Sequence, residues 1–383
     1  MREFICFLSE TQQMLFEAAA HFAHTDILPL AQEIDETDEF PRHLWPKLGQ
    51  LGYLGLTAPV EFGGSNLGYT AHTLVMQALS TASAAVGLSY AAHSNLCLNQ
   101  LVRWGSSEQK FKYLPKLISG EHVGALAISE EQAGSDCLNL QLKATPCEQG
   151  YRLNGRKMWI TNAPDADLII VYARTAYHSK GSGITAFIID KNLEGWHATQ
   201  PIKKMGMRGS NTSEIVFKDC EVPKDRVLGT PDQACAVLMS GLDYERIVLS
   251  GGPIGIMTAC LNTLKPYLNE RIQFDQPIVQ FQSTQFKLAD IYTRYQSAQY
   301  HVYGVAMAAD QGSLSSKMAA SCFLQASESA TCIALDTIQL LGGNGYTTAY
   351  PAERYLRDAK LYEIGGGTSE ILRSIIGRTF ISK

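Results

Sequence analysis

The chain has 383 residues, of which 45% are hydrophobic and 18% are charged, and its formal net charge is −5. This composition is typical of a folded globular protein and excludes a disordered or collagen-like chain. The slightly acidic balance also gives no basic surface for nucleic acid or an anionic membrane. At roughly 150 residues per domain, the length predicts two or three domains.

The cysteines and histidines form no recognisable metal or disulfide pattern. There are nine cysteines and no CxxC pair, which favours a reducing compartment over a secreted disulfide framework. His21 and His24 share a helical face, but no HExxH follows, so we expect no metal site.

No uninterrupted apolar run reaches the roughly 18 residues that span a bilayer, so no membrane span is predicted. The N-terminal segment has neither a secretory signal nor an Arg-rich presequence. We therefore expect a cytoplasmic location of bacterial type, or the mitochondrial matrix if a presequence has been removed.

Residues 1–122 are predicted to form a helical domain. Leu15, Ala18, Ala19 and Phe22 recur at helical spacing. The alanine- and leucine-rich stretch that follows later in this region has no strand-like alternation, so we expect helices there too. His93 lies in that stretch and is interpreted as a core or capping histidine.

Residues 123–229 are predicted to form a β domain. The segments 167–174 and 184–190 are apolar runs of strand length. Asn154-Gly155 is a typical hairpin turn, so we expect a hairpin centred on it.

Residues 230–383 are predicted to form a four-helix bundle, because long helical patterns return with short connections. Within it, GGPIG at 251–255 has glycines that favour close helix packing or the approach of a ligand rather than a nucleotide loop. The expected helical segments are 232–263, 265–271 continuing into 281–310, 316–343 and 351–377.

Three short segments have the features of a ligand site, although each also has an ordinary structural explanation. The polar segment 127–140 contains Gly134 and hydroxyl groups that favour phosphate or a flat ring, or it is simply a loop. The segment 158–161 places a tryptophan at a strand end, where it is either a site or a core residue. In 362–373, three glycines precede Thr368-Ser369, where a helix start would favour an anionic group or merely be capped.

Taken together and in order, seven blocks resemble the acyl-CoA dehydrogenase family from end to end. The resemblance is closest to the branch that acts on isovaleryl-CoA. The blocks are AISEEQAGSD, KMWITNA, KKMGMRGSNTSEIVF, GLDYERIVLSGGPIG, RIQFDQP, IQLLGGNGYT and RDAKLYEIGGGTSEI.

The resemblance implies the acyl-CoA dehydrogenase fold, which is mainly α-helical. It has an N-terminal helical domain, a middle β-barrel domain and a C-terminal four-helix bundle. It also implies non-covalent FAD, a homotetramer and an electron-transfer flavoprotein as partner. The implied reaction converts isovaleryl-CoA to 3-methylcrotonyl-CoA in leucine catabolism, with loss of an α-proton and transfer of the β-hydride to flavin N5.

The catalytic base is where this sequence departs from most of the family. Most members carry a carboxylate at the position of Gly366, which has no side chain here. The isovaleryl branch uses the Glu of Leu-Asp-x-Glu-Arg, which is Glu245, and the Gly366 N–H is then expected to donate to the thioester carbonyl. Glu245 could instead be a surface residue paired with a basic neighbour, and Glu363 and Glu370 are weaker candidates.

The resemblance also implies a wide pocket for a short branched acyl chain. Leu88 and Leu249 match its apolar walls, with plain core packing as the alternative, and Gly365 replaces a bulky residue of straight-chain enzymes. Further substrate contacts are carried over at Ser135, Gly181, Ser182, Asp243, Tyr244, Arg246 and Gly367.

The FAD contacts implied by the resemblance fall into two groups. One group comes from the same chain: Leu126, Ala127, Ile128, Ser129, Gly134, Ser135, Trp159, Ile160, Thr161, Thr368, Ser369 and Glu370. The other would come from a neighbouring subunit: Arg271, Gln282, Gln339, Gly342 and Gly343.

Some features leave the function open. Asp275 replaces a glycine beside the expected phosphate contact Arg271 and adds negative charge there. The alternatives to the isovaleryl reaction are dehydrogenation of another branched or terpenoid acyl-CoA, an acyl-CoA oxidase, and a non-catalytic flavoprotein on the same fold.

Overall fold

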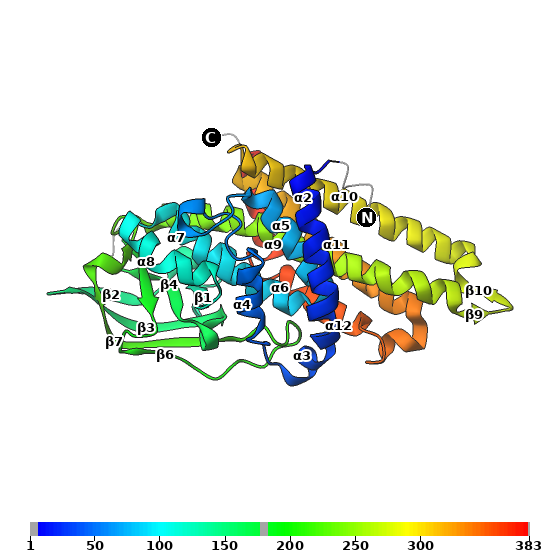
Figure 1. Ribbon diagram of the computed structural model, residues 1–383, viewed down its shortest axis with the longest axis horizontal. Coiled ribbons are helices and arrows are strands. Elements are labelled where there is room, and N and C mark those ends of the chain that lie inside the picture. The colour runs from blue at the N-terminus through cyan, green and yellow to red at the C-terminus, as the bar shows by residue number, and fades with distance from the viewer. Residues whose placement is uncertain (1–6, 177–182, 382–383) are drawn as a thin grey trace.

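The computed structural model describes residues 7–176 and 183–381. Figure 1 shows the strands of residues 124–228 gathered at one end of an elongated molecule, with the long helices of the C-terminal half extending to the other end. The N-terminal helices lie between and alongside these two parts. The expected order of a helical, a β and a second helical region is therefore confirmed.

The N-terminal region is helical, as its apolar spacing predicted. Its first helix starts at the N-cap Ser9, whose hydroxyl accepts a hydrogen bond from the Gln12 N–H, and it buries Ala19 and Phe22. A π-helical segment interrupts the later helices. The helices are α2 (Glu10–Phe22), α3 (Ala31–Thr37), α4 (Leu44–Gln50), α5 (Gly68–Ala82), α6 (Ala84–Ala91), the π-helix η4 (Ala92–Asn99), α7 (Gln100–Trp104) and α8 (Ser107–Ile118).

In the described part of the chain, the middle region forms one eight-stranded mixed sheet. Its order is β6-β7-β3-β2-β4-β5-β8, and β1 pairs in parallel with β4. The strands are β1 (Gly124–Ala127), β2 (Lys143–Cys147), β3 (Gly150–Thr161), β4 (Leu168–Arg174), β5 (Ile184–Asp190), β6 (Trp196–Ala198), β7 (Thr212–Pro223) and β8 (Val227–Leu228).

The hairpin prediction at Asn154-Gly155 was wrong. Strand β3 runs through both residues, and the turn lies earlier, where Cys147 of β2 pairs with Gly150 of β3. Gly155 has φ +138°, and the register with β7 shifts between Leu153 and Gly155. Because a glycine with positive φ also suits a β-bulge, the same dipeptide bends a continuous strand here.

The C-terminal region is a helix bundle, with two boundaries different from those predicted. Its first helix continues through Pro266 to Glu270, because burial of Leu264 and Leu268 outweighs the one helix hydrogen bond that proline removes. The helices are α9 (Ala234–Glu270), α10 (Gln282–Asp310), α11 (Ser316–Leu341), α12 (Ala352–Tyr362) and α13 (Ser369–Arg378). A small hairpin, β9 (Ile272–Gln273) and β10 (Gln276–Pro277), joins α9 to α10.

The second difference is a break in the segment 351–377. Gly366 and Gly367 adopt φ of +75° and +106°, which ends the helical path between α12 and α13. The segment 265–271, which was expected to run into α10, belongs to α9 and its cap.

The glycines of GGPIG bring α9 against α5. A Cβ atom at Gly251 would lie 2.6 Å from the Thr73 carbonyl oxygen, and one at Gly255 would lie 2.7 Å from the Gln77 carbonyl oxygen. The close-packing interpretation of this motif is therefore confirmed. The N-terminal half of α9 is fixed in the molecular core by this contact.

Helix α9 is long and apolar enough to cross a membrane by length and composition, with a mean hydropathy of 1.5 in its best window. The criterion of an uninterrupted apolar run does not select this helix, because scattered polar residues interrupt its apolar stretch. Because 83% of that window is buried inside the protein, α9 is explained as a core helix.

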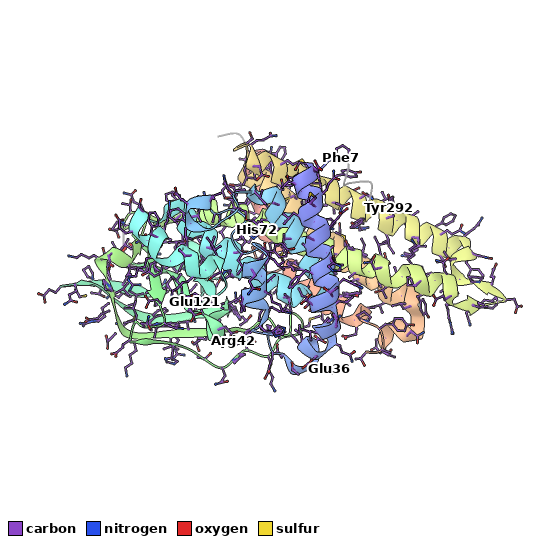
Figure 2. The ribbon with its side chains drawn as sticks, viewed as in Figure 1. Phe7, Glu36, Arg42, His72, Glu121 and Tyr292 are labelled. Atoms are coloured by element: carbon purple, nitrogen blue, oxygen red, sulfur yellow. The ribbon has the colours of Figure 1, made fainter. Side chains whose placement is uncertain are left out.

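The interpretation of His93 as a core histidine agrees with the structure. His93 is buried, and its two ring nitrogens lie 2.9 Å from the Leu117 carbonyl oxygen and 2.8 Å from the Gly124 nitrogen. Within residues 7–176 and 183–381, no cluster of metal-binding side chains is found, and the cysteines are free. Figure 2 shows another buried histidine, His72, within the helical layer, whereas Tyr292 lies on α10 and is partly exposed.

Candidate active site

Glu245 is a buried carboxylate on α9, in the half of the helix that packs inside the molecule. The residue is 9% exposed. Burial raises the pKa of Glu245 to about 7, and the neighbouring Arg246 guanidinium opposes this rise. A carboxylate with such a pKa is more basic than an exposed one and is still partly ionised at neutral pH. Glu245 therefore has the properties of a proton acceptor, and the surface-residue alternative does not fit.

The two weaker candidates lie in different surroundings. Glu363 forms an ion pair with Lys360, with 2.8 Å between oxygen and nitrogen. Glu370 is exposed in the first turn of α13. Neither residue is as deeply buried as Glu245, so neither is desolvated to the same extent.

Gly366 meets the helix that carries Glu245. A Cβ atom at position 366 would lie 3.2 Å from Leu249 Cδ2 and 2.9 Å from Phe323 Cε1. Leu249 is one helical turn after Glu245 and therefore shares its face. The base and the glycine loop, which are 121 residues apart in sequence, are thus brought to one place, and Phe323 fills the space that a side chain at 366 would need.

The backbone of the loop between α12 and α13 has an N–H group, at Gly366, that is available to a ligand. Among the described residues, the Gly366 N–H donates to no protein acceptor, whereas the Gly365 N–H donates to the Leu361 carbonyl at 2.8 Å. Thr368 caps α13 by accepting a hydrogen bond from the Ile371 N–H at 3.3 Å. A free N–H beside a buried carboxylate suits a substrate carbonyl whose α-carbon is to lose a proton.

Arg246 and Asp243, which were expected to contact the substrate, have partners within the protein. Arg246 Nη1 donates to Asp243 Oδ1 at 2.9 Å, and Arg246 Nε donates to the Gly366 carbonyl at 3.1 Å. The second Asp243 oxygen accepts from the Ser316 hydroxyl at 2.5 Å. These contacts join α9, the start of α11 and the glycine loop.

The residues expected around the acyl chain and CoA lie near this end of α9. Tyr244 stacks on Tyr69, with ring centroids 4.3 Å apart, and the Arg103 guanidinium lies 4.3 Å from the Tyr244 ring centroid. Leu88 is half-buried on α6 and packs against the same core as Leu249. Both leucines are therefore part of the core, and their place in the acyl pocket stays a prediction.

Gly365 differs from Gly366 in the space around it. A Cβ atom at Gly365 would find its nearest neighbour, the Leu361 carbonyl oxygen, 3.6 Å away. A Cβ atom at this position would therefore make only ordinary van der Waals contacts with Leu361. The role of Gly365 in widening the acyl pocket stays a prediction.

The expected flavin contacts from the β domain meet at the ends of β1 and β3. The Met158 N–H donates to the Ser129 carbonyl at 2.9 Å, which joins the polar loop to the tryptophan strand. Trp159 has φ +59° and is 53% exposed, while Ile160 beside it is buried. A bulky residue held in this unfavourable backbone region indicates a functional constraint. The exposed indole gives a flat aromatic surface for a ring system.

The remaining β-domain positions are distributed around this edge. Leu126, Ala127 and Ile128 are buried, and Thr161 is half-buried. Gly134 and Ser135 are exposed, and a Cβ atom at Gly134 would meet nothing within 4 Å. Gly181 and Ser182 lie outside the described residues.

Sequence reasoning missed a buried ion pair beneath the polar loop. Lys157 is completely buried, and its Nζ lies 2.9 Å from Glu130 Oε1 and 2.8 Å from the Ile128 carbonyl oxygen. Glu130 also accepts hydrogen bonds from the Gln141 and Leu142 N–H groups. The available signal was a lysine within an apolar strand and an acidic residue in the loop, but an inward-pointing lysine is uncommon.

The second group of expected FAD contacts lies at the far end of α9, beside the β9–β10 hairpin (Figure 1). The Ile278 N–H donates to the Arg271 carbonyl at 2.9 Å, and the Tyr267 hydroxyl donates to the Leu341 carbonyl at 3.0 Å. These bonds hold the ends of α9 and α11 and the start of α10 together. The residues of this group are Arg271, Gln282, Gln339, Gly342 and Gly343.

The two groups of expected FAD contacts lie on different parts of the chain. The first is carried by the β domain and the start of α13, whereas the second surrounds the β9–β10 hairpin, the start of α10 and the end of α11. The contribution of the second group from a neighbouring subunit stays a prediction.

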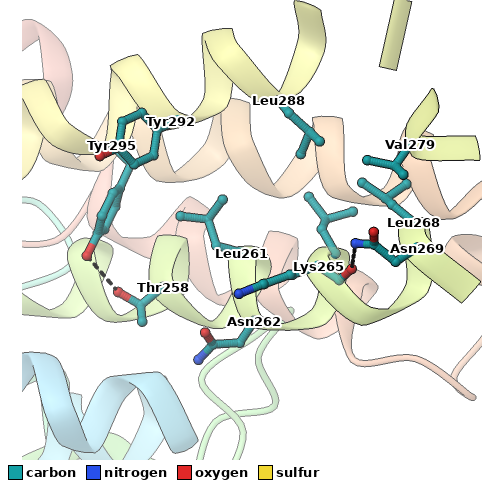
Figure 3. Close-up of a pocket in the computed structure, with 11 residues that line it drawn as sticks. Thr258, Leu261, Asn262, Lys265, Leu268, Asn269, Val279, Leu288, Tyr292 and Tyr295 are labelled. Carbon is teal, nitrogen blue, oxygen red and sulfur yellow. Dashed lines mark hydrogen bonds between the residues drawn. The ribbon is translucent and has the colours of Figure 1, made fainter. Parts of the chain in front are cut away.

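The cavity between α9 and α10 is separate from the candidate active site. It measures about 510 Å³ and is lined by residues such as Leu261, Leu268 and Leu288 (Figure 3). Thr258, at its near edge, is already 13 residues after Glu245, or about 20 Å along the helix. Its lining carries no acidic residue, so it offers no counterpart to the Glu245 carboxylate.

Comparison with known protein families agrees with the order of the three regions. The N-terminal, middle and C-terminal domain models of acyl-CoA dehydrogenase match residues 9–121, 125–220 and 235–381. The chain belongs to the acyl-CoA dehydrogenase family. The fold expected from the seven sequence blocks is thereby confirmed.

Individual relatives cover nearly the whole chain. An isovaleryl-CoA dehydrogenase of Solanum tuberosum, described as mitochondrial, is 54% identical over 96% of this chain and 90% of its own length. A 2-methylacyl-CoA dehydrogenase of the same plant is 51% identical over 97% of this chain and 90% of its own length. The solved structure of butyryl-CoA dehydrogenase from Megasphaera elsdenii superimposes with a TM-score of 0.96 and 33% identity, covering 98% of this chain and 99% of that one.

Proposed function

We propose that this acyl-CoA dehydrogenase family member uses FAD to oxidise isovaleryl-CoA to 3-methylcrotonyl-CoA, with Glu245 as the catalytic base. The observation that carries the proposal is the buried carboxylate of Glu245 beside Gly366, a position without a side chain. The chain thus supplies the base from α9 and leaves the loop with backbone donors only. The similarity to the isovaleryl-CoA dehydrogenase of Solanum tuberosum supports the substrate.

The chemistry of the protein residues follows from their places. The ionised Glu245 carboxylate removes the α-proton, and burial raises the pKa of this group to about 7. The free Gly366 N–H donates to the thioester carbonyl, which makes the α-proton more acidic. Leu249 and Phe323 exclude water from the same place, which strengthens both interactions.

The residues present fit FAD. Trp159 offers an exposed ring at the strand end, and Gly134, Gly342 and Gly343 leave open space where a Cβ atom would meet nothing within 4 Å. Bound FAD would supply the acceptor, flavin N5, for the β-hydrogen that leaves the substrate as hydride. The proposed holding residues are the two groups described above, with Thr368, Ser369 and Glu370 at the start of α13, and with Arg271 suited to a pyrophosphate oxygen.

The substrate proposal has a specific competitor. The 2-methylacyl-CoA dehydrogenase relative is nearly as similar as the isovaleryl relative, so a chain branched at C2 rather than C3 is the second candidate. Both branched chains need the width left by Gly365. The pocket walls Leu88 and Leu249 and the CoA contacts at Ser135, Gly181, Ser182, Asp243, Tyr244 and Gly367 are proposed on the family pattern.

The proposed partners follow from the same assignment. We infer a homotetramer from the family pattern, in which the second group of FAD contacts would come from a neighbouring copy of the chain. An electron-transfer flavoprotein is the proposed electron acceptor, with direct reoxidation by oxygen as the alternative. The free cysteines of the described residues agree with a reducing compartment such as the bacterial cytoplasm or the mitochondrial matrix.

Anaerobic titration of the FAD-loaded protein tests this function. Isovaleryl-CoA is expected to bleach the oxidised flavin band at stoichiometric amounts, and faster than 2-methylbutyryl-CoA or butyryl-CoA. Faster bleaching by 2-methylbutyryl-CoA would replace the substrate assignment. Absence of bleaching by any of these thioesters, in protein that retains FAD, would favour a non-catalytic flavoprotein.

A further inference from the structure

The guanidinium of Arg246 lies at the junction between the base helix and the donor loop. Its Nε donates to the Gly366 carbonyl at 3.1 Å, while its Nη1 donates to Asp243 at 2.9 Å. The residue is 5% exposed, so both bonds are shielded from water. A CoA-binding role was expected for Arg246, but two of its donor nitrogens are used within the protein.

The partner Asp243 is itself fixed. It accepts from Arg246 with one carboxylate oxygen and from the Ser316 hydroxyl at the start of α11 with the other. The hydrogen bonds thus run from α11 through Asp243 and Arg246 to Gly366. A guanidinium anchored at one side can hold a carbonyl in a defined place at the other.

Hydrogen bonds fix the loop on both sides of the glycine pair, from the Gly365 N–H to the Leu361 carbonyl and from the Ser369 N–H to the Glu363 carbonyl, but Gly366 itself has few other contacts. Gly366 and Gly367 have no side chains and adopt φ of +75° and +106°. The Gly366 N–H, among the described residues, donates to no protein acceptor. Packing of Gly366 against Phe323 restricts the movement of the loop on one side, and the hydrogen bond from Arg246 restricts its movement on another.

We propose that Arg246 is a positioning residue, whose bond to the Gly366 carbonyl holds the Gly366 N–H in place for the substrate thioester beside Glu245. This inference rests on the proposed dehydrogenation and deepens it. Arg246 then contributes mainly to the chemical step, by way of the loop. A direct contact to CoA would contribute mainly to substrate binding.

A second effect of Arg246 is electrostatic and separable. Its charge lowers the pKa of Glu245, against the rise caused by burial. Other charged groups on elements that contact α9 are engaged elsewhere: Arg103 of α7 lies against Tyr244, Glu328 of α11 pairs with Arg373, and Lys360 of α12 pairs with Glu363. On α9 itself, Asp243 pairs with Arg246. Removal of the charge and removal of the Nε bond therefore predict different results.

Two substitutions separate these effects. Arg246→Lys keeps the charge but cannot reproduce the paired Nε and Nη1 bonds, so kcat is expected to fall about 10- to 100-fold. KM for isovaleryl-CoA should change less than threefold, and the acidic limb of the pH profile should stay in place. Arg246→Gln is expected to lower kcat similarly and also to move that limb to higher pH by about one unit, because the opposing charge is lost.

Hydrogen exchange measures the loop without depending on activity. In FAD-loaded protein without substrate, peptides covering 363–372 should exchange faster in Arg246→Lys than in the unmodified chain. Arg226→Lys is the matched control, since the Arg226 side chain is also largely shielded, at 13% exposed, and bonded to an aspartate, Asp190, but lies in the β domain. In Arg226→Lys, the exchange rate of peptides covering 363–372 and the kcat should both stay within twofold of the unmodified chain. Asp243→Asn serves as a second variant if Arg246→Lys does not fold, with a smaller change in the same direction.

The outcomes distinguish the proposals. A raised KM with unchanged kcat in Arg246→Lys would overturn the positioning role in favour of a CoA contact. Unchanged exchange of 363–372 would also overturn it. If the unmodified protein does not reduce its flavin with any acyl-CoA, the proposed function fails, while the exchange result still decides whether Arg246 fixes the loop.

Discussion

The two ends of α9 differ in how complete they are within one chain. At the Glu245 end, the carboxylate and Leu249 are buried on one face of the helix, and Leu249 packs against Gly366. At the other end, Arg271 is exposed and the hairpin beside it presents Phe274 with 88% of its surface accessible. The groups proposed for proton removal at the Glu245 end therefore all come from one chain, whereas the Arg271 end exposes polar and apolar side chains that another subunit would cover. We infer that substitutions at the Glu245 end affect the chemical step, whereas substitutions at the Arg271 end affect cofactor retention through assembly.

The largest expected effect is the loss of the base. Glu245→Gln is expected to slow flavin reduction by isovaleryl-CoA about a thousandfold, because the amide cannot accept the α-proton. Stopped-flow absorbance of FAD-loaded protein measures it. Glu363→Gln and Glu370→Gln are the matched controls and should stay within a few-fold of the unmodified rate. Near-normal reduction in Glu245→Gln would remove the assignment of the base.

The same residue predicts a change of stability with pH. Because the folded-state pKa of Glu245 is raised from 4.5 to about 7, its stabilising contribution is full below pH 4.5 and is lost as pH rises through 7. Relative to Glu245→Gln, the unmodified protein should lose on the order of 3 kcal/mol over this range. Denaturant unfolding at pH 5 and pH 8 measures the difference. An equal gap between the two proteins at both pH values would show that Glu245 is not desolvated.

The steric fit at Gly366 gives the next effect. Gly366→Ala introduces a Cβ atom 2.9 Å from Phe323 and at positive φ, so the loop must move, and flavin reduction should fall about tenfold or more. Gly365→Ala, where the nearest atom is 3.6 Å away, should cost less than threefold. Phe323→Leu combined with Gly366→Ala should recover part of the loss. Equal losses at 365 and 366 would contradict the packing argument.

The far end of α9 should affect cofactor binding rather than chemistry. Arg271→Ala is expected to weaken FAD binding about tenfold, because a charge-assisted contact to pyrophosphate is lost. FAD titration of apoprotein measures it, together with oligomer size by light scattering. Arg152→Ala, which removes an exposed arginine of the β domain, is the control. A fall in the flavin reduction rate of FAD-saturated Arg271→Ala would contradict the separation of the two ends.

The smallest expected effect lies in the hairpin. Phe274 and Asp275 form its two-residue turn with φ of +51° and +61°, a conformation that favours glycine at the second position. Asp275→Gly is expected to stabilise the protein by about 0.5–1 kcal/mol and to improve FAD retention. Asp275→Asn removes the charge but keeps a side chain, so it separates the electrostatic from the conformational effect. Thermal unfolding and FAD titration measure both.

The sequence by itself determined the order of the three regions and the family, and it pointed to Glu245 as the proposed base. Helical spacing, strand-length apolar runs and the Asp-Tyr-Glu-Arg motif involve residues that are close together in the sequence, so they can be recognised without the structure. The domain boundaries 1–122, 123–229 and 230–383 stay predictions, as do the individual FAD and CoA contacts.

Only the tertiary structure decided the features that depend on distant neighbours. Asn154-Gly155 favours a hairpin locally, but pairing of β3 with β7 turns it into a bulge. Lys157 reads as a surface residue until Glu130 meets it in the interior. The hydrogen bond from Arg246 to the Gly366 carbonyl, 120 residues later, is likewise visible only in the folded chain. In each case, packing between segments far apart in the chain outweighed the local preference, because burial and pairing energies depend on neighbours that the local sequence does not contain.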